Sequence, residues 1–285
     1  MSAIIMAGPQ AAASRFTLDT FLDNIDTAAY RNFVETKADF RQGMRSDTGA
    51  SGTSFFQHNA NNTRYLTAVT GFVGGSGGSW ATVPNKWRSA KGSTLVFMNS
   101  SNDPTSSQDT VTNATFNGNS ITLTDQSPSG YIARDYVYQS LYMRYYTHSS
   151  DSSTYNLSGA TIGATFNKLS QNNFNSQTIV GLPGKWDVVD THTTTHSVGG
   201  QSYTTGTSYQ AGDVILLQSG ENDDTNKFFD MEDSGGNATR RGSTRTGNWY
   251  NLHNFELYTV DSAGTVTWDG TFQDGLSYIA LRFAG

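Results

Sequence analysis

The chain has 285 residues and an unusual composition: 15% of the residues are charged, 35% are hydrophobic, none is cysteine, and the net charge is −6. Soluble domains usually contain about 25% charged residues, whereas 120 of these 285 residues are Gly, Ser, Thr or Asn. Glu and Lys, which favour helices, number 4 and 6, so the composition argues against a mainly helical fold. The 35 aromatic residues supply material for a packed core and argue against a disordered chain.

Several classes of protein are disfavoured by the same counts. No run of about 18 apolar residues is present, so we predict no transmembrane helix and no membrane insertion. The absence of cysteine excludes a disulfide scaffold and a thiolate metal site. A sequence pI near 5.2 and the few lysines argue against binding to nucleic acid.

Helical spacing is concentrated in residues 17–42, where apolar side chains recur three and four positions apart and Gly43 supplies a stop. We therefore predict two parts: an N-terminal arm and helix over residues 1–45, and a β body over residues 46–285. The first part is predicted to mediate attachment or oligomerisation. The side chains expected to make that contact are Ile4, Ile5, Phe21, Leu22, Ile25 and Phe33.

From residue 46 onward the chain shows short runs of β-branched and aromatic residues between Gly, Ser, Asn and Asp turns. The clearest signal is Asn117-Gly118 between two alternating runs, which predicts a hairpin with a type I′ turn. The predicted strands are 64–73, 94–98, 110–116, 119–124, 131–147, 160–166, 178–182, 186–190, 201–205, 214–218, 249–260, 266–272 and 277–283.

This spacing of strands, without alternating helices, predicts the fold class. We expect a mainly β protein whose body is an antiparallel β-sandwich or jelly roll, with a short N-terminal helical arm.

Two groups of residues raise the question of a metal ion. His192 and His196 are four residues apart in a Thr-rich run that favours a strand, where the rings would lie about 13 Å apart; we interpret them as polar residues on a strand face. Asp223, Asp224 and Asp230 belong to the densest acidic stretch and supply the oxygen ligands that Ca²⁺ prefers, but without EF-hand spacing. A solvated loop is the simpler interpretation, so no cofactor is predicted and Ca²⁺ stays a weak alternative.

A glycan-binding surface is a second possibility. Flat aromatic rings stack on sugars, and neighbouring Asn, Asp and Thr side chains bind hydroxyl groups. The aromatic residues that lie beside Gly and Asn loops are Trp80, Trp87, Trp249, Tyr250 and Trp268. The alternative interpretation is that these rings build the core.

Catalytic motifs give little support for an enzyme. Hydrolysis of a glycosidic bond requires a pair of carboxyl groups, and no closely spaced pair of glutamates is present. The match of residues 74–78 to G-x-S-x-G lacks the following helix that a nucleophile elbow requires. We predict that the protein is not an enzyme and name no catalytic residue.

The segment 270–285, GTFQDGLSYIALRFAG, resembles the C-terminal β modules of tailed-bacteriophage virion proteins, in particular appendage proteins of marine and cyanobacterial phages. Richness in Ser, Thr, Asn and Gly, low Lys and Glu, and absent Cys are also similar to that group. The resemblance covers some 16–40 residues and supplies no catalytic residue.

What the resemblance implies is a non-enzymatic virion structural protein that decorates the capsid (a cement protein) or forms part of a tail or fibre appendage. It would be assembled in the host cytoplasm and lie on the exterior of the particle. We expect a homo-oligomer, with a trimer favoured, held by the N-terminal arm to other virion proteins such as the major capsid or tail proteins. A carbohydrate-binding adhesin that recognises a host surface glycan is the alternative, and a glycan depolymerase is the third hypothesis.

Overall fold

The described part of the chain consists mainly of antiparallel β-strands. In this computed structural model the described residues are 53–60, 64–71, 77–82, 91–103, 110–128, 132–133, 140–157, 159–167, 175–195, 202–221, 232–233, 235–248, 251–269 and 275–284. The pairings between these strands are antiparallel, so the predicted mainly β, antiparallel fold class is confirmed. The predicted arm and helix of residues 1–45 lie outside the described residues.

Two sheets form the first half of the fold. Sheet I consists, in spatial order, of β3 (Gly77–Thr82), β10 (Thr161–Asn167), β5 (Thr110–Phe116) and β6 (Asn119–Ser120). Sheet II consists of β11 (Asn175–Pro183), β4 (Ser93–Asp103), β9 (Ser140–Ser150) and β7 (Thr124–Asp125), with β8 (Ile132–Ala133) paired to one end of β9. A 3₁₀ turn follows β9 at Ser153–Tyr155.

Two further sheets form the second half. Sheet III consists of β12 (Trp186–Thr195), β19 (Gly275–Phe283), β14 (Val214–Glu221), β17 (Asn251–Val260) and β16 (Ala238–Asn248). Sheet IV is small and consists of β13 (Tyr203–Thr204), β18 (Thr267–Asp269) and β15 (Glu232–Asp233). A separate hairpin of β1 (Thr53–Ala60) and β2 (Arg64–Gly71) lies beside β11.

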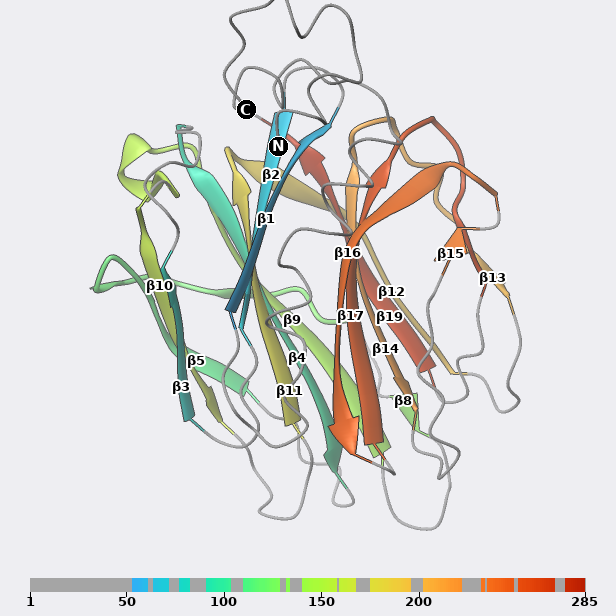
Figure 1. The fold of residues 1–285 in the computed structure, drawn as a ribbon, viewed down its shortest axis with the longest axis horizontal. Coiled ribbons are helices and arrows are strands. Elements are labelled where there is room, and N and C mark those ends of the chain that lie inside the picture. The colour runs from blue at the N-terminus through green and yellow to red at the C-terminus, as the bar shows by residue number, and fades with distance from the viewer. Residues whose placement is uncertain are drawn as a thin grey trace, which may run out of the picture.

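The four sheets are stacked in the order I, II, III, IV. Figure 1 shows this order across the view, from β10, β5 and β3 on one side, through β9, β4 and β11, to the strands of sheet III and finally β13 and β15. Three clusters of buried apolar side chains fill the spaces between neighbouring sheets. The molecule is therefore a layered stack with three cores.

The central strands β4 of sheet II and β14 of sheet III are buried on both faces. In β4, Leu95 and Phe97 belong to the core between sheets I and II, whereas Val96 and Met98 belong to the core between sheets II and III. The strand β14 divides its side chains in the same alternating way between the second and third cores. Because successive side chains of a strand point to opposite faces, a strand with two buried faces needs a continuous apolar run.

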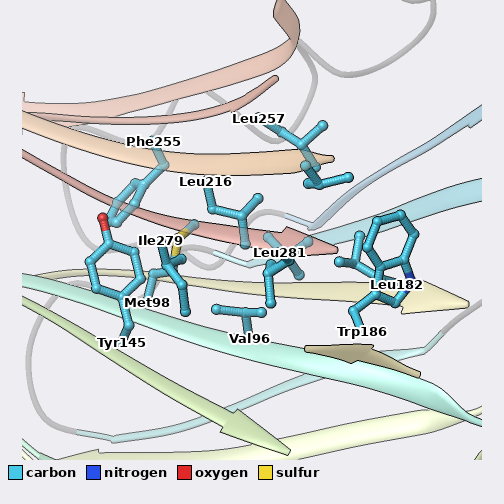
Figure 2. Close-up of a cluster of buried hydrophobic side chains, with 12 residues drawn as sticks. Val96, Met98, Tyr145, Leu182, Trp186, Leu216, Phe255, Leu257, Ile279 and Leu281 are labelled. Carbon is cyan, nitrogen blue, oxygen red and sulfur yellow. The ribbon is translucent and has the colours of Figure 1, made fainter. Parts of the chain in front are cut away.

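The core between sheets II and III contains large side chains from both sheets, with Trp186, Tyr145 and Phe255 fully buried. Figure 2 shows Val96 and Tyr145 from sheet II facing Leu216 and Phe255 from sheet III. The Tyr145 hydroxyl donates to the backbone oxygen of Ser277 at 2.8 Å, so the ring links the two sheets by a hydrogen bond as well as by packing. A two-sheet sandwich, as predicted, is thus too simple a description of this body.

The predicted hairpin is confirmed. Asn117 and Gly118 have φ values of 50° and 78°, as a type I′ turn requires, and β5 pairs with β6 across it. The amide nitrogen of Thr161 donates to Oδ1 of Asn117 at 2.8 Å, which ties the turn to the start of β10. After β6 the chain crosses from sheet I to sheet II, where β7 pairs with β9.

The chain passes from sheet II to sheet III through a buried junction between Pro183 and Trp186. The backbone nitrogen of Trp186 donates to Oγ1 of Thr94 at 2.8 Å, and its indole Nε1 donates to the backbone oxygen of Pro183 at 2.8 Å. The hydroxyl oxygens of Thr94 and Ser149 lie 2.7 Å apart. These contacts fix the angle at which β12 leaves sheet II.

Candidate functional site

A β-bulge in β12 decides which of its side chains lie on the face of sheet III that is turned towards sheet IV. Trp186 and Val188 point into the core between sheets II and III, and regular alternation would send Asp190 to the same buried side. The register against β19 shifts between Val188 and Asp190, with Val189 as the extra residue. Asp190 and His192 therefore share a face with Ala280 and Tyr278 of β19, on the side of sheet IV.

This bulge creates a group of polar aromatic side chains, which we call the tyrosine–aspartate cluster: Asp190, His192, Tyr203, Tyr209 and Tyr278. The hydroxyl of Tyr209 donates to Oδ2 of Asp190 at 2.8 Å, and the hydroxyl of Tyr278 donates to the same oxygen at 3.1 Å. Two phenols thus hold one carboxylate oxygen in place. Asp190 and His192 lie on β12, Tyr203 on β13 and Tyr278 on β19. Tyr209 lies outside these strands and forms an isolated bridge with Gly264.

The imidazole of His192 lies within the aromatic part of this cluster. Its ring is stacked on Tyr203 with centroids 4.7 Å apart and an interplanar angle of 19°, and its centroid lies 5.6 Å from that of Tyr278. Burial lowers the pKa of His192 from its ordinary value of 6.5, although the charge of Asp190 acts in the opposite direction. The ring is therefore neutral at pH 7, with one nitrogen able to accept a hydrogen bond.

The phenols of the cluster are held in their protonated form. Burial raises the pKa of Tyr209 and of Tyr278 well above the ordinary value of 10.0, and the nearby carboxylate of Asp190 reinforces the effect. A phenol that stays protonated donates hydrogen bonds and is a poor nucleophile. The cluster is consequently suited to orienting a fixed acceptor, Asp190, and so to binding through hydrogen bonds.

Two ion pairs on the same side of sheet III stabilise the surrounding structure. Arg282 makes a bidentate contact with Asp213, with Nε to Oδ1 at 2.8 Å and Nη2 to Oδ2 at 2.6 Å. Arg240 donates to Oε1 of Glu256 at 3.2 Å, and the Tyr258 hydroxyl donates to Oε2 of the same residue at 2.6 Å. Both carboxylates are almost fully buried, so each pair balances a charge within the fold.

The structure corrects one of the predicted glycan-binding residues. Trp268 is 0% exposed in the core between sheets III and IV, where its ring makes an edge contact with Tyr258 at 4.5 Å. It has no face available to a sugar. For Trp80 the structure describes the backbone, within β3, but not the side chain, while Trp87, Trp249 and Tyr250 lie outside the described residues.

The other predicted site residues have separate outcomes. The strand over Trp186–Thr195 confirms that His192 belongs to a strand face, and His196 lies outside the described residues. The same is true of Asp223, Asp224 and Asp230, and of Ile4, Ile5, Phe21, Leu22, Ile25 and Phe33. Among the residues that the structure does describe, no group of three or more His, Asp or Glu side chains could hold a metal ion.

Sequence reasoning missed Asp190, Tyr203, Tyr209 and Tyr278. The alternation of Asp190 and His192 in a strand was a usable signal, because both residues then share a face. The bulge at Val189 has no sequence signature, and the pairing of β13 with β18 joins residues more than 60 positions apart.

Comparisons with protein-family models, with curated proteins and with solved structures find no match to this chain. Over the described ranges, no helix has the length and apolarity that crossing a bilayer requires.

Proposed function

We propose that the protein is a non-enzymatic structural component of a virion, exposed on the particle exterior as a capsid decoration or as part of a tail or fibre appendage. The observation that carries the proposal is the position of β19, which lies within the segment 270–285 that resembles phage virion modules. This strand pairs with β12 on one side and β14 on the other. Its side chains contribute to two cores, so the segment that carries the resemblance organises sheet III.

The stacked sheets suit a protein that must withstand proteases outside the cell. Proteolysis requires local opening, and a strand buried on both faces opens only when two cores are disrupted together. The central strands β4 of sheet II and β14 of sheet III both have this property.

The edges of sheet III suit a protein that is present at high local concentration. Both outer strands of this sheet are irregular: β12 has its bulge at Val189, and β16 shifts register between Arg240 and Gly242. Bulges on edge strands disfavour pairing with a second molecule and so reduce aggregation. Ordered attachment would then depend on another surface, for which the N-terminal segment of residues 1–45 is our candidate.

The proposal is tested on particles of a phage whose genome encodes this chain. Mass spectrometry of purified particles should detect the protein, and gold-labelled antibodies against the β body should bind intact particles. A genome that encodes the chain without residues 1–45 should yield particles that lack the protein, while the purified truncated protein keeps the thermal melt of the β body. Absence of the protein from purified particles would refute the virion role, and normal incorporation of the truncated chain would refute attachment through residues 1–45.

A further inference from the structure

The tyrosine–aspartate cluster has a buried floor and an accessible rim. Tyr209 and Tyr278 are about 1% exposed, whereas Asp190, His192 and Tyr203 are partly exposed. The two buried tyrosines hold the Asp190 carboxylate in place, because both of their hydroxyls donate to its Oδ2. Within the described structure Oδ1 of Asp190 makes no hydrogen bond. This oxygen is also not buried, since it is absent from the set of buried atoms that lack a partner.

The aromatic rings of the rim form a short stack that ends at Tyr203. His192 lies between Tyr203 and Tyr278, with centroid distances of 4.7 and 5.6 Å. One face of Tyr203 is therefore occupied by His192, and its ring contacts within the described residues are to His192 and Tyr278. A half-buried ring at the end of a stack, beside a fixed carboxylate, combines a flat apolar face with a strong acceptor.

The charges around the tyrosine–aspartate cluster restrict the charge of a ligand that could bind there. Asp190 brings a negative charge, and the two arginines on this side of sheet III whose side chains the structure describes, Arg240 and Arg282, are each paired with a buried carboxylate. Among the side chains that the structure describes on this face, an anionic ligand would meet the charge of Asp190 and no unpaired arginine to balance it. The parallel stacking of His192 on Tyr203 also turns ring faces towards each other, unlike the open cage of faces that binds quaternary ammonium groups.

We propose that the tyrosine–aspartate cluster is a binding site for a neutral sugar. Oδ1 of Asp190 accepts a hydrogen bond from a sugar hydroxyl. Nδ1 of His192 bonds to an adjacent hydroxyl, since Nε2 of the same ring is buried. The face of Tyr203 that does not stack on His192 packs on the apolar face of the pyranose ring. The site is distinct from the tryptophans predicted from sequence, and it does not depend on the proposed virion role.

The test is affinity electrophoresis of the full chain in native gels that contain dextran, mannan or galactan as neutral polysaccharides. Alginate, a polymer of uronic acids, supplies the anionic comparison, and tetramethylammonium chloride added to the gel tests for binding of a cation. We expect retardation in at least one neutral gel, none in alginate, and no competition by tetramethylammonium. Y203A and D190N should each weaken the retardation at least about tenfold, the loss of one well-placed contact.

The chain supplies a matched control. His148 and Tyr155 form a second histidine–tyrosine pair, with centroids 4.8 Å apart, on the far side of sheet II and with no carboxylate among the contacts described for it. Y155A should leave the retardation unchanged. If Y203A does not fold, as judged by its thermal melt, H192A removes the middle ring of the stack and takes its place.

Four outcomes would overturn the proposal, and the first three concern the retardation itself. They are no retardation in any neutral gel, retardation that survives both Y203A and D190N in folded protein, and retardation that tetramethylammonium abolishes, which would indicate a cation site. Retardation lost in Y155A as fully as in Y203A would also refute it, because the effect would then be one of general stability. None of these results bears on whether the protein is found in particles, so the two proposals fail separately.

Discussion

Alanine at Gly92 should destabilise the protein far more than alanine at Gly118. Both glycines have a left-handed backbone, with φ of 82° and 78°, so both substitutions meet the same conformational cost. Their surroundings differ. A Cβ at Gly118 would meet nothing within 4 Å, whereas a Cβ at Gly92 would lie 2.0 Å from the backbone oxygen of Ser150 and 2.7 Å from Cα of Asp151.

The magnitude follows from these distances. A left-handed conformation costs an L-residue about 1–2 kcal/mol, which is the whole effect expected for G118A. In G92A, ordinary contact begins near 3.4 Å, so Gly92 and Ser150 must separate by about 1.4 Å from the 2.0 Å approach. That shift breaks the terminal pairing of β4 with β9 and the bond from the nitrogen of Gly184 to the oxygen of Gly92, now 3.0 Å. Two lost hydrogen bonds add about 2–3 kcal/mol, for a total of about 3–5 kcal/mol.

The comparison is made by thermal melts of the two variants, followed by circular dichroism in the far ultraviolet. One kcal/mol corresponds to roughly 2–4 °C for a domain of this size, so G92A should melt about 4–12 °C below G118A. Equal melting temperatures would show that the start of β4 moves away from Ser150 without cost. The inference that this junction holds sheets II and III at a fixed angle would then be wrong.

Three further predictions concern other fixed points of the stack. T94V should cost about 1–3 kcal/mol in urea unfolding, because it keeps the side-chain shape and removes the nearer acceptor for the nitrogen of Trp186, at 2.8 Å against 3.3 Å for Oγ of Ser149. T94S, which keeps the hydroxyl, should cost less, and the reverse order would contradict the assigned role of the bond. D213A should destabilise the protein by about 2 kcal/mol in the same assay. This value is smaller than that for a fully buried ion pair, because the Arg282 side chain is 34% exposed. An unchanged midpoint would mean that solvent already screens the pair. Because the pKa of His192 is lowered in the fold, its contribution to stability is complete above pH 6.5 and is lost as the pH falls below that value, where the unfolded chain binds the proton first. Melting temperatures of H192Q should therefore fall less between about pH 7 and pH 5 than those of the unchanged chain, and identical slopes would exclude this role.

Local features of the fold were predictable from sequence, whereas the layering was not recognised. The turn at Asn117-Gly118 depends on two adjacent residues that tolerate positive φ, so it can be read directly. The apolar runs at residues 94–98 and 214–218 were correctly predicted as strands. Their continuity is typical of sheets that are buried on both faces, but a run of four or five residues does not say which other sheets cover it.

The candidate site depends on strand pairing and register, which the amino-acid sequence alone does not reveal. Trp268 precedes Asp269 and Gly270, a setting typical of an exposed ring, yet it belongs to strand β18 of sheet IV and its ring packs on Tyr258. Asp190 reaches the surface cluster only because Val189 is inserted into the register of β12. A single residue of slip moves a side chain to the other face of a sheet, and the register is set by pairing with β19, some 90 residues further along the chain.

The position of β19 also has a consequence for biosynthesis. This strand is translated after every other described strand, yet it occupies the place between β12 and β14. Until residues 275–283 emerge from the ribosome, the facing edges of β12 and β14 have no partner, and the apolar side chains of two cores are exposed to water. Such long-range closure is slow, and unpaired edges promote aggregation. Nascent chains that stall or terminate before β19 should therefore need chaperones to stay in solution. Every full-length copy also passes through this stage, in which β12 and β14 lack their partner strand, before its synthesis is complete.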